Sequence, residues 1–275
     1  MIDIVKFFNK TSIGKKHIVE NIKCQDYSDS YQSFDRTIVT ACDGHGGNLY
    51  IRSDKGSKFA SEAVVNVLSS FKWMTFYHND RIELTNQIRI QILCEWNKLV
   101  EEDLADHPID ESEMEKLNHV ERLRLINNPV KAYGTTVGGA MIIKNKIICV
   151  SLGDGGCFLL EKGKIYPAFE EDDSQVANIT NSLCQRDAFD ALHVGVFDGN
   201  KFDGVLICSD GVINPYGSIA NFEKYLAIPA TNKVLLNKND ELSDFITDLG
   251  AEKGIGDDVS LSIVINKRDN IKYYM

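Results

Sequence analysis

The sequence predicts an α+β fold in a single domain that spans residues 1–275. Two amphipathic helical stretches separate blocks of short, β-branched segments, and a further helical stretch comes near the end of the chain. Elements of these two kinds pack as layers, with helices covering the faces of sheets. No linker rich in Pro, Gly or Ser and no internal repeat divides the chain. A chain of this length can bury a sizeable core.

The charge balance narrows the classes of function. The chain has 30 Lys and Arg against 40 Asp and Glu, which gives a net charge of −10 at pH 7. An acidic surface argues against a nucleic-acid partner and against an anionic membrane surface. No apolar run reaches the length of a membrane span, and residues 1–10 lack the apolar core of a signal peptide. We therefore expect a soluble protein without nucleic-acid or membrane partners.

The cysteines indicate a reducing compartment. They number seven, an odd count, and no C-x-x-C pair occurs among them. Most lie in apolar, strand-like runs, where cysteine behaves as a small hydrophobic residue. Neither a zinc site nor a disulfide framework is expected. The predicted location is the cytoplasm.

The first half of the chain predicts strands followed by two long helices. Residues 2–35 have the pattern of short β-like pieces separated by turns, including 18–19 and 22–27. Residues 37–41 are apolar and β-branched, which is typical of a buried strand. Helices are expected over 55–73 and 82–104, where apolar residues recur at helical spacing. Residues 106–130 are charged and irregular, and predict a short helix with a loop.

The second half predicts mainly strands. Two of them, 137–143 and 147–152, flank a turn, and a hairpin is expected across Lys162-Gly163. Residues 170–191 are polar and predict a loop. The remaining expected elements are a buried strand at 205–208, a helix at 242–253 and a strand at 259–265.

The stretch with the most chemical content follows the strand at 37–41. It reads Asp43-Gly44-His45-Gly46-Gly47. Glycine allows the backbone to approach a ligand closely, and a carboxylate at a strand end can hold a hard cation together with carbonyl oxygens. The alternative is a glycine-rich turn in which the Asp only caps the backbone.

The same pattern recurs along the chain. Three short apolar strands end in Asp-Gly, and one Asp directly precedes a strand; these acids are Asp43, Asp154, Asp210 and Asp257. Several carboxylates at one rim repel one another unless cations neutralise them. Oxygen ligands without Cys or clustered His favour Mg²⁺ or Mn²⁺ over Zn²⁺. Two such ions can hold a phosphate and activate a water, although each acid alone could be a turn residue.

The ordered set of motifs resembles the metal-dependent type 2C (PPM) protein serine/threonine phosphatases. The matching pieces run from about residue 17 to residue 265 in the order of that family: Gln25-Asp26, Asp43-Gly44-His45-Gly46-Gly47, Gly134-Thr135-Thr136, Gly153-Asp154-Gly155, Ser209-Asp210-Gly211 and Asp257-Asp258-Val259-Ser260. A bacterial branch is the most similar, because it shares the pattern His17…Cys24-Gln25-Asp26 and the later Arg52-Ser53-Asp54.

The resemblance implies a fold and an activity. The fold would be a four-layer αββα sandwich, in which two antiparallel sheets pack face to face with helices on both outer sides. The activity would be hydrolysis of phosphoserine and phosphothreonine in proteins by a water that two Mn²⁺ or Mg²⁺ ions activate. The partners would be a phosphorylated protein and a cognate Ser/Thr kinase system of bacterial signalling.

The resemblance also implies roles for single residues. Asp43 would bridge the two metal ions, and the carbonyl of Gly44 would complete one coordination sphere. Asp26, Asp210 and Asp257 would be further acids of the centre, although the neighbouring Asp258 is an alternative to Asp257. Asp154 would serve a third ion. His45 would protonate the leaving oxygen as general acid; the alternative is a loop histidine without a catalytic role.

Two positions depart from the family pattern. The arginine that usually binds the phosphate is replaced by Asn21, and an Asp that several members use for a third ion is replaced by Asn214. We hypothesise that Arg52, assisted by His17, binds the phosphate instead, since arginine can pair with two phosphate oxygens. The alternatives are that Arg52 belongs only to a helix cap and that His17 is only a strand residue.

Two other functions remain open at this level. The chain could be a catalytically weak, phosphatase-like regulatory module that binds metal or phosphoprotein without turnover. It could also hydrolyse a small phosphoester or a nucleotide. The two substituted asparagines favour the regulatory module, and the retained acids favour an enzyme.

Overall fold

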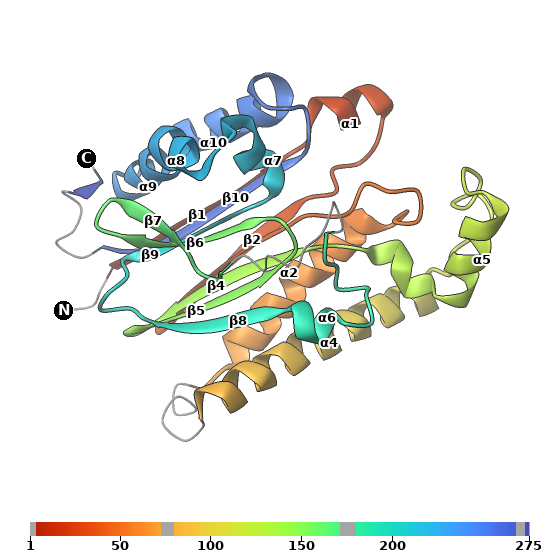
Figure 1. Ribbon diagram of the computed structural model, residues 1–275, viewed down its shortest axis with the longest axis horizontal. Coiled ribbons are helices and arrows are strands. Elements are labelled where there is room, and N and C mark those ends of the chain that lie inside the picture. Colours follow the sequence, from red (N-terminus) through yellow and green to blue (C-terminus); the bar gives the residue numbers. More distant parts are fainter. Residues whose placement is uncertain (1–3, 73–79, 171–179, 268–272, 275) are drawn as a thin grey trace.

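Two five-stranded antiparallel sheets form the centre of the structure, a computed structural model that describes residues 4–72, 80–170, 180–267 and 273–274 (Figure 1). The strand order is β1-β10-β9-β6-β7 in the first sheet and β2-β3-β4-β5-β8 in the second. The first sheet consists of β1 (Ile4–Ser12), β10 (Val259–Lys267), β9 (Gly204–Cys208), β6 (Gly156–Glu161) and β7 (Lys164–Pro167). The second consists of β2 (Tyr27–Gln32), β3 (Arg36–Cys42), β4 (Val137–Ile143), β5 (Lys146–Leu152) and β8 (His193–Asp198).

Helices cover the outer face of each sheet, as Figure 1 shows. The helices α2 (Ser53–Ser70) and α4 (Arg81–Asp106) pack on the second sheet. The helices α9 (Ile228–Leu235) and α10 (Asn239–Asp248) pack on the first. The four-layer αββα sandwich is therefore confirmed.

The alternation of side chains along β3 explains why residues 38–42 of this strand are mostly apolar. Val39 and Ala41 point into the core between the two sheets, whereas Ile38 and Cys42 point into the core under α2 and α4. Successive side chains of a strand face opposite sides, so a strand covered on both sides favours apolar residues at most of its positions. This burial holds the end of β3, and the acid that follows it, at a defined place.

Shorter elements connect the layers. They are α1 (Lys15–Glu20), α5 (His119–Asn127), α6 (Ala188–Ala191), α7 (Asp210–Ile213) and α8 (Ile219–Phe222), with 3₁₀ turns at Pro129–Tyr133 and Asn214–Tyr216 and π-helical turns at Glu223–Ala227 and Leu249–Lys253. The hairpin of β6 and β7 turns at Lys162-Gly163, as predicted, with both residues at positive φ. Among the described residues, no helix is long and apolar enough to span a membrane.

Two expectations about local structure need correction, and two regions had no expected element. Residues 18–19, expected in a β-like piece, belong to helix α1. The strand β8 and the helical region 212–238 had no assignment from sequence. The expected loop 170–191 contains α6, and its residues 171–179 lie outside the described residues. The helix α1 buries none of its residues, so its sequence has no apolar periodicity from which a helix could be predicted. Contacts with other segments, such as the hydrogen bond from Lys16 to Gly256, keep it in place.

Candidate metal centre

The register of the strands brings the predicted acids to one rim. In the second sheet Tyr27 pairs with Cys42, so the chain places Asp26 and Asp43 one position beyond this pair. In the first sheet Gly156 pairs with Cys208, and Asp154 and Asp210 follow two positions beyond. Because the sheets pack face to face, acids that are far apart in sequence meet at one end of the sandwich.

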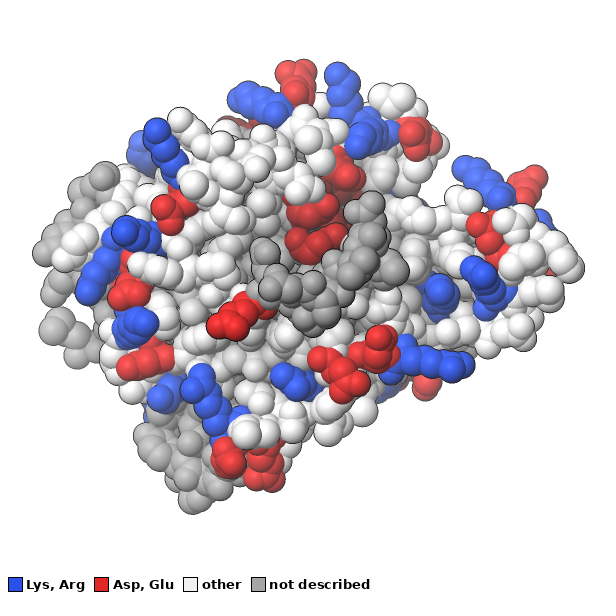
Figure 2. Space-filling model, viewed as in Figure 1, with Lys and Arg blue, Asp and Glu red and all other residues white. Residues whose placement is uncertain are grey.

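These acids line one cavity of about 190 Å³. Its lining consists of His17, Gln25, Asp26, Asp43, Gly44, His45, Gly46, Asp154, Asp210, Asp257 and Asp258. No Lys or Arg belongs to this lining, within the part of the chain that the structure describes. Figure 2 shows acidic side chains gathered in a hollow near the centre of this face. All the acids, the glycine and the histidine predicted for metal binding and catalysis therefore lie together.

The buried acids have strongly perturbed proton affinities. Asp26 is only 5% exposed, and burial raises its pKa to about 7. Burial also raises the pKa of Asp43, and the charges of Asp26 and Asp210 raise it further. The pKa of Asp210 is raised by burial and then by the charge of Asp154. The carboxyl groups of Asp26 and Asp43 each perturb the pKa of the other. Such a cluster is stable at neutral pH only when protons or cations offset its charge.

The chemistry of the donors fits hard divalent cations. The lining offers carboxylate and backbone oxygens, the ligands that Mg²⁺ and Mn²⁺ prefer. Among the described residues, no three His, Cys, Asp or Glu side chains converge on one ready-made ion position.

The backbone around Gly44 is too crowded for a side chain. A Cβ there would lie 2.6 Å from the carbonyl oxygens of both Gln25 and Ser53. The N–H of Gly44 donates to the Gln25 carbonyl at 3.1 Å. The glycine therefore lets the segment before Asp26 and the start of α2 pack directly on the loop that carries Asp43.

The motif Gly134-Thr135-Thr136 forms hydrogen bonds with the backbone of the loop that carries Asp43. The backbone N–H of Thr136 and the hydroxyl of Thr135 each donate to the Asp43 carbonyl at 2.8 Å. The Thr136 hydroxyl accepts from the N–H of Asp43 at 3.0 Å. These contacts position the backbone of Asp43 and leave its carboxylate to the cavity.

His45 contributes an unpartnered nitrogen to the cavity. Its backbone N–H donates to the Gly134 carbonyl at 3.0 Å, and its ring lies 5.0 Å from the ring of Tyr50. Its Nε2 atom is buried and has no hydrogen-bond partner among the described atoms. Burial lowers the pKa of His45. A buried nitrogen without a partner is costly, so a ligand oxygen in the cavity would relieve it.

The carboxylate of Asp258 accepts hydrogen bonds from the backbone, whereas the carboxylate of Asp257, which lines the cavity, accepts none from the residues that the structure describes. The carboxylate of Asp258 accepts from the N–H groups of Gly14 and Gln25 at 2.6 Å each, and from Nδ1 of His17 at 2.8 Å. A carboxylate with three such donors has little capacity left for a metal ion. This favours Asp257 over Asp258 as a ligand, the choice that the sequence left open.

His17 lies at the rim of the cavity, but on helix α1 rather than on the expected strand segment. Because the Asp258 carboxylate can only accept, Nδ1 of His17 carries the proton of their hydrogen bond. The Nε2 side of the ring remains for a ligand. His17 therefore lies beside the acids of the cavity, and its role in binding the phosphate stays a prediction.

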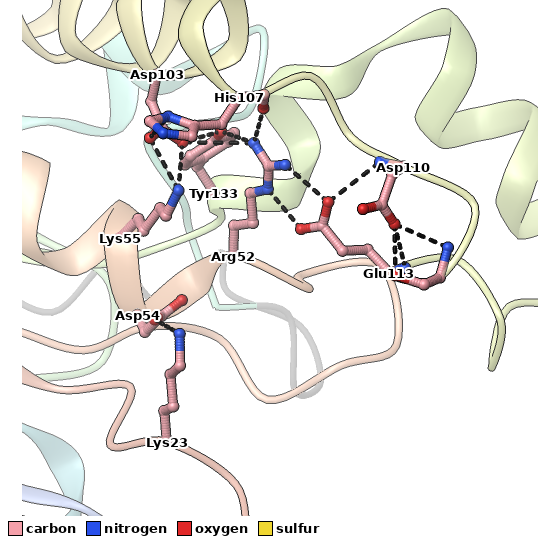
Figure 3. Close-up of polar contacts among 10 residues, drawn as sticks. Lys23, Arg52, Asp54, Lys55, Asp103, His107, Asp110, Glu113 and Tyr133 are labelled. Carbon is pink, nitrogen blue, oxygen red and sulfur yellow. Dashed lines mark hydrogen bonds and ion pairs between the residues drawn. The ribbon is translucent and has the colours of Figure 1, made fainter.

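The expectation for Arg52 is corrected by its contacts, shown in Figure 3. The Arg52 side chain is 6% exposed and does not line the cavity. Its Nε and Nη2 atoms donate to the two carboxylate oxygens of Glu113 at 2.7 Å each. Nη1 donates to the Tyr133 hydroxyl at 2.6 Å and to the His107 carbonyl at 2.7 Å. These bonds use four of the five N–H donors of the guanidinium and hold it outside the cavity lining, so Arg52 is a structural residue here.

Asn214 and Asn21 have ordinary structural contacts. The side-chain amide of Asn214 donates to Asp210 at 2.9 Å, and Asn21 ends helix α1 in the left-handed conformation with φ 54°. Asp154, the acid predicted for a third ion, accepts a hydrogen bond from the Thr180 hydroxyl at 2.6 Å. Neither asparagine lines the cavity.

Sequence reasoning missed the partners that hold these groups. The roles of Glu113 and Tyr133 have no sequence signal, because their contacts join segments that are distant along the chain. Ser260 donates to Asp26 at 2.7 Å, a contact that the sequence does not predict. The motif Asp257-Asp258-Val259-Ser260 could have suggested it, because side chains of alternate residues at a strand start face the same side.

Comparisons with known proteins agree with the fold. The protein phosphatase 2C family profile matches residues 13–246. No curated protein sequence matches the chain. Among solved structures, the serine/threonine phosphatase of S. agalactiae has a TM-score of 0.60 at 15% identity, over 96% of this chain and 100% of that one. Stp1 from Staphylococcus aureus has a TM-score of 0.55 at 14% identity, over 98% and 96%. The PstP catalytic domain, in complex with two manganese ions, has a TM-score of 0.55 at 14% identity, over 95% and 97%.

Proposed function

The chain belongs to the protein phosphatase 2C family, and on this premise we propose that it is a metal-dependent phosphatase acting on phosphoserine and phosphothreonine in proteins. The observation that carries the proposal is the cavity in which Asp26, Asp43, Asp154, Asp210 and Asp257 meet without any Lys or Arg in the described lining. Uncompensated acids at this density need cations, and cations beside a polar cavity can bind a phosphate.

The residues suited to hold two Mn²⁺ or Mg²⁺ ions are the acids of this lining. Asp43 is central, because its carboxyl contacts that of Asp26 and its pKa responds to Asp210 and Asp154. The Gly44 carbonyl, Asp26, Asp210 and Asp257 would complete the centre. When bound, the two ions would neutralise the carboxylates, hold the phosphate and supply an activated water. The two manganese ions of the PstP catalytic domain support this choice of metal.

The two histidines of the lining would contact oxygens of the substrate: His17 a phosphate oxygen and His45 the leaving oxygen. His17, held by Asp258 through Nδ1, would place the Nε2 side of its ring beside a phosphate oxygen. His45, whose Nε2 has no partner among the described atoms, would give its proton to the leaving oxygen. A leaving alkoxide needs a proton, since serine and threonine hydroxyls are weak acids.

The test measures phosphate release from a panel of phosphoserine and phosphothreonine peptides and from nucleotides, with Mn²⁺, with Mg²⁺ and with a chelator. We expect metal-dependent release from peptides and little from nucleotides. Turnover of nucleotides alone would instead indicate a small-molecule phosphoesterase. Peptide binding without release in any metal would indicate a regulatory module, and either result would contradict the proposal.

A further inference from the structure

Helix α1 presents an apolar surface that no other described segment covers. None of its six residues is buried. Ile18 is 55% exposed and Val19 is 76% exposed. Ile22, just after the helix, is 37% exposed, and Ile255 on a neighbouring turn is 43% exposed. Large apolar side chains gathered at one place on a surface are typical of an interaction site.

A groove of about 410 Å³ lies between α1 and residues 251–256. Lys15, Lys16 and Val19 line it from the helix, and Ile255 lines it from the other segment. The backbone N–H of Lys16 donates to the carbonyl of Gly256 at 2.9 Å, which joins the two sides. The groove is therefore a feature of two connected segments rather than of one free helix.

The groove lies beside the acidic cavity, because consecutive residues of the same two segments line one and the other. His17, the next residue after Lys16, lines the cavity, and so does Asp257, the next residue after Gly256. The same two segments thus form one side of the cavity and both sides of the groove. An extended chain advances about 3.3 Å per residue, so a polypeptide with its phosphate in the cavity would reach the groove within a few residues.

The charges around the groove indicate what kind of polypeptide could bind there. The chain carries a net charge of −10 and the described cavity lining holds no Lys or Arg, so acidic polypeptides are repelled from most of this face. Lys15 and Lys16 are exposed beside the cavity and form no ion pair with any residue that the structure describes. Figure 2 shows basic side chains over α1 next to the acidic hollow. Glu20 and Glu252 also line the groove, so the groove carries both signs of charge, and the two lysines are its positive part.

We propose that α1 and residues 251–256 are the docking surface for the substrate polypeptide. The occupant is the segment of a phosphoprotein next to its phosphorylated serine. An aliphatic residue of that segment packs on Val19 and Ile255, and an acidic residue pairs with Lys15 and Lys16. This inference rests on the proposed function, because it takes the cavity as the place of the phosphate.

Two double variants and two matched controls test the proposal. Val19→Ser with Ile255→Ser removes the apolar contact, and Lys15→Glu with Lys16→Glu reverses the charge. Val120→Ser and Lys116→Glu make the same kinds of change at exposed positions elsewhere in the chain. The altered side chains are exposed, so the fold should tolerate the changes, and thermal unfolding checks this.

The first measurement compares kcat and KM for three substrates: a phosphoserine peptide with Leu and Glu beside the phosphoserine, a matched peptide with Ser and Lys there, and a small aryl phosphate. We expect each double variant to raise KM for the first peptide roughly tenfold, and to leave the aryl phosphate and the second peptide unchanged. An equal effect on the aryl phosphate, or no effect on the first peptide, overturns the proposal.

The second measurement separates docking from turnover. Binding of a non-hydrolysable phosphonate version of the first peptide is followed by fluorescence anisotropy with Mn²⁺ present. If the wild type binds this peptide through the groove but hydrolyses no peptide, the docking surface stands and the proposed function fails. If it hydrolyses peptides but the variants bind as tightly as the wild type, or if it binds no peptide, the docking surface is wrong. Sedimentation completes the test by measuring the oligomeric state. If the wild type is a dimer, and the Val19→Ser, Ile255→Ser variant is a monomer that binds the peptide as tightly, the surface binds a second copy of the chain and the proposal is wrong.

Discussion

Arg52 and Glu113 form a two-pronged ion pair, in which Nε and Nη2 of the arginine each lie 2.7 Å from a carboxylate oxygen of the glutamate. The pair joins the start of α2 to the turn that follows α4, across 61 residues of sequence. Tyr133 and Asp103 extend it, since the Tyr133 hydroxyl accepts from Arg52 and donates to Asp103 at 2.6 Å. Figure 3 shows that Lys55 reaches the same Asp103 carboxylate. The network lies next to residues 134–136, which hold the loop of Asp43.

Replacement of Arg52 by Ala should lower stability rather than act on the substrate. The change leaves Glu113 without its partner and Tyr133 without a donor in a largely buried place. We expect the free energy of unfolding to fall by about 3 kcal/mol, as measured by urea denaturation. Lys253→Ala, which breaks an exposed pair with Asp248, should change it by roughly 0.5 kcal/mol or less. A selective rise in KM for an aryl phosphate with unchanged stability would contradict this assignment.

The same ion pair predicts a pH dependence of stability. The hydrogen bonds from Arg52 lower the pKa of Glu113. A carboxylate with a lowered pKa contributes stability above its ordinary pKa, and this contribution is lost as the pH falls through the lowered value. The wild type should therefore exceed Glu113→Gln in unfolding free energy at pH 7, and the difference should shrink below about pH 4. A difference that stays constant from pH 7 to pH 3 would show that the charge is unimportant.

Replacement of Asp43 by Asn tests the metal centre. The expected loss in kcat for an aryl phosphate is roughly 100-fold or more, because in the proposed centre this carboxylate would hold both ions and position the water. A chelator should abolish the wild-type activity, and added Mn²⁺ or Mg²⁺ should restore it. Thermal unfolding with and without Mn²⁺ provides a second readout, since the variant should lose most of the stabilisation by metal. Undiminished turnover, in the variant or in chelator, would be incompatible with a two-metal centre.

Replacement of His17 by Ala tests the phosphate contact. A hydrogen bond to a charged group contributes about 1.5 kcal/mol, which corresponds to roughly tenfold in kcat/KM for an aryl phosphate. Metal affinity measured by calorimetry should change little, because the ring binds Asp258 and not the ions. His107→Ala is the matched control, since that side chain is 68% exposed and lies outside the cavity lining. Unchanged kinetics in His17→Ala would remove this residue from the site.

Replacement of Asn214 by Asp tests the third ion. The Asn214 side chain contacts Asp210, on the side of the cavity where Asp154 lies. A carboxylate there would add charge for a hard cation, so calorimetric titration with Mn²⁺ should show an additional ion bound by the variant. The wild type should bind a third ion weakly or not at all. Tight binding of three ions by the wild type would contradict the prediction.

The sequence by itself determined the layers and the acids of the site. Buried strands such as β3 and long helices such as α2 and α4 have apolar residues at the spacing of their own geometry, so local pattern suffices to find them. Asp43, Asp154, Asp210 and Asp257 could be found because each follows or precedes an apolar strand, and strands of packed sheets end at common rims. Asp26 was indicated by the Gln25-Asp26 motif of the family resemblance. Asp26, Asp43, Asp154, Asp210 and Asp257 accordingly line one cavity.

Only the tertiary structure decided which partner each polar group takes. His17 meets Asp258 across 241 residues; this contact holds α1 in place and separates the role of Asp258 from that of Asp257. Arg52 has the sequence context of a phosphate ligand, but Glu113 lies closer and binds two of its donors. A guanidinium or a carboxylate pairs with whichever charge the fold brings within about 3 Å, and no local pattern of residues encodes that distance.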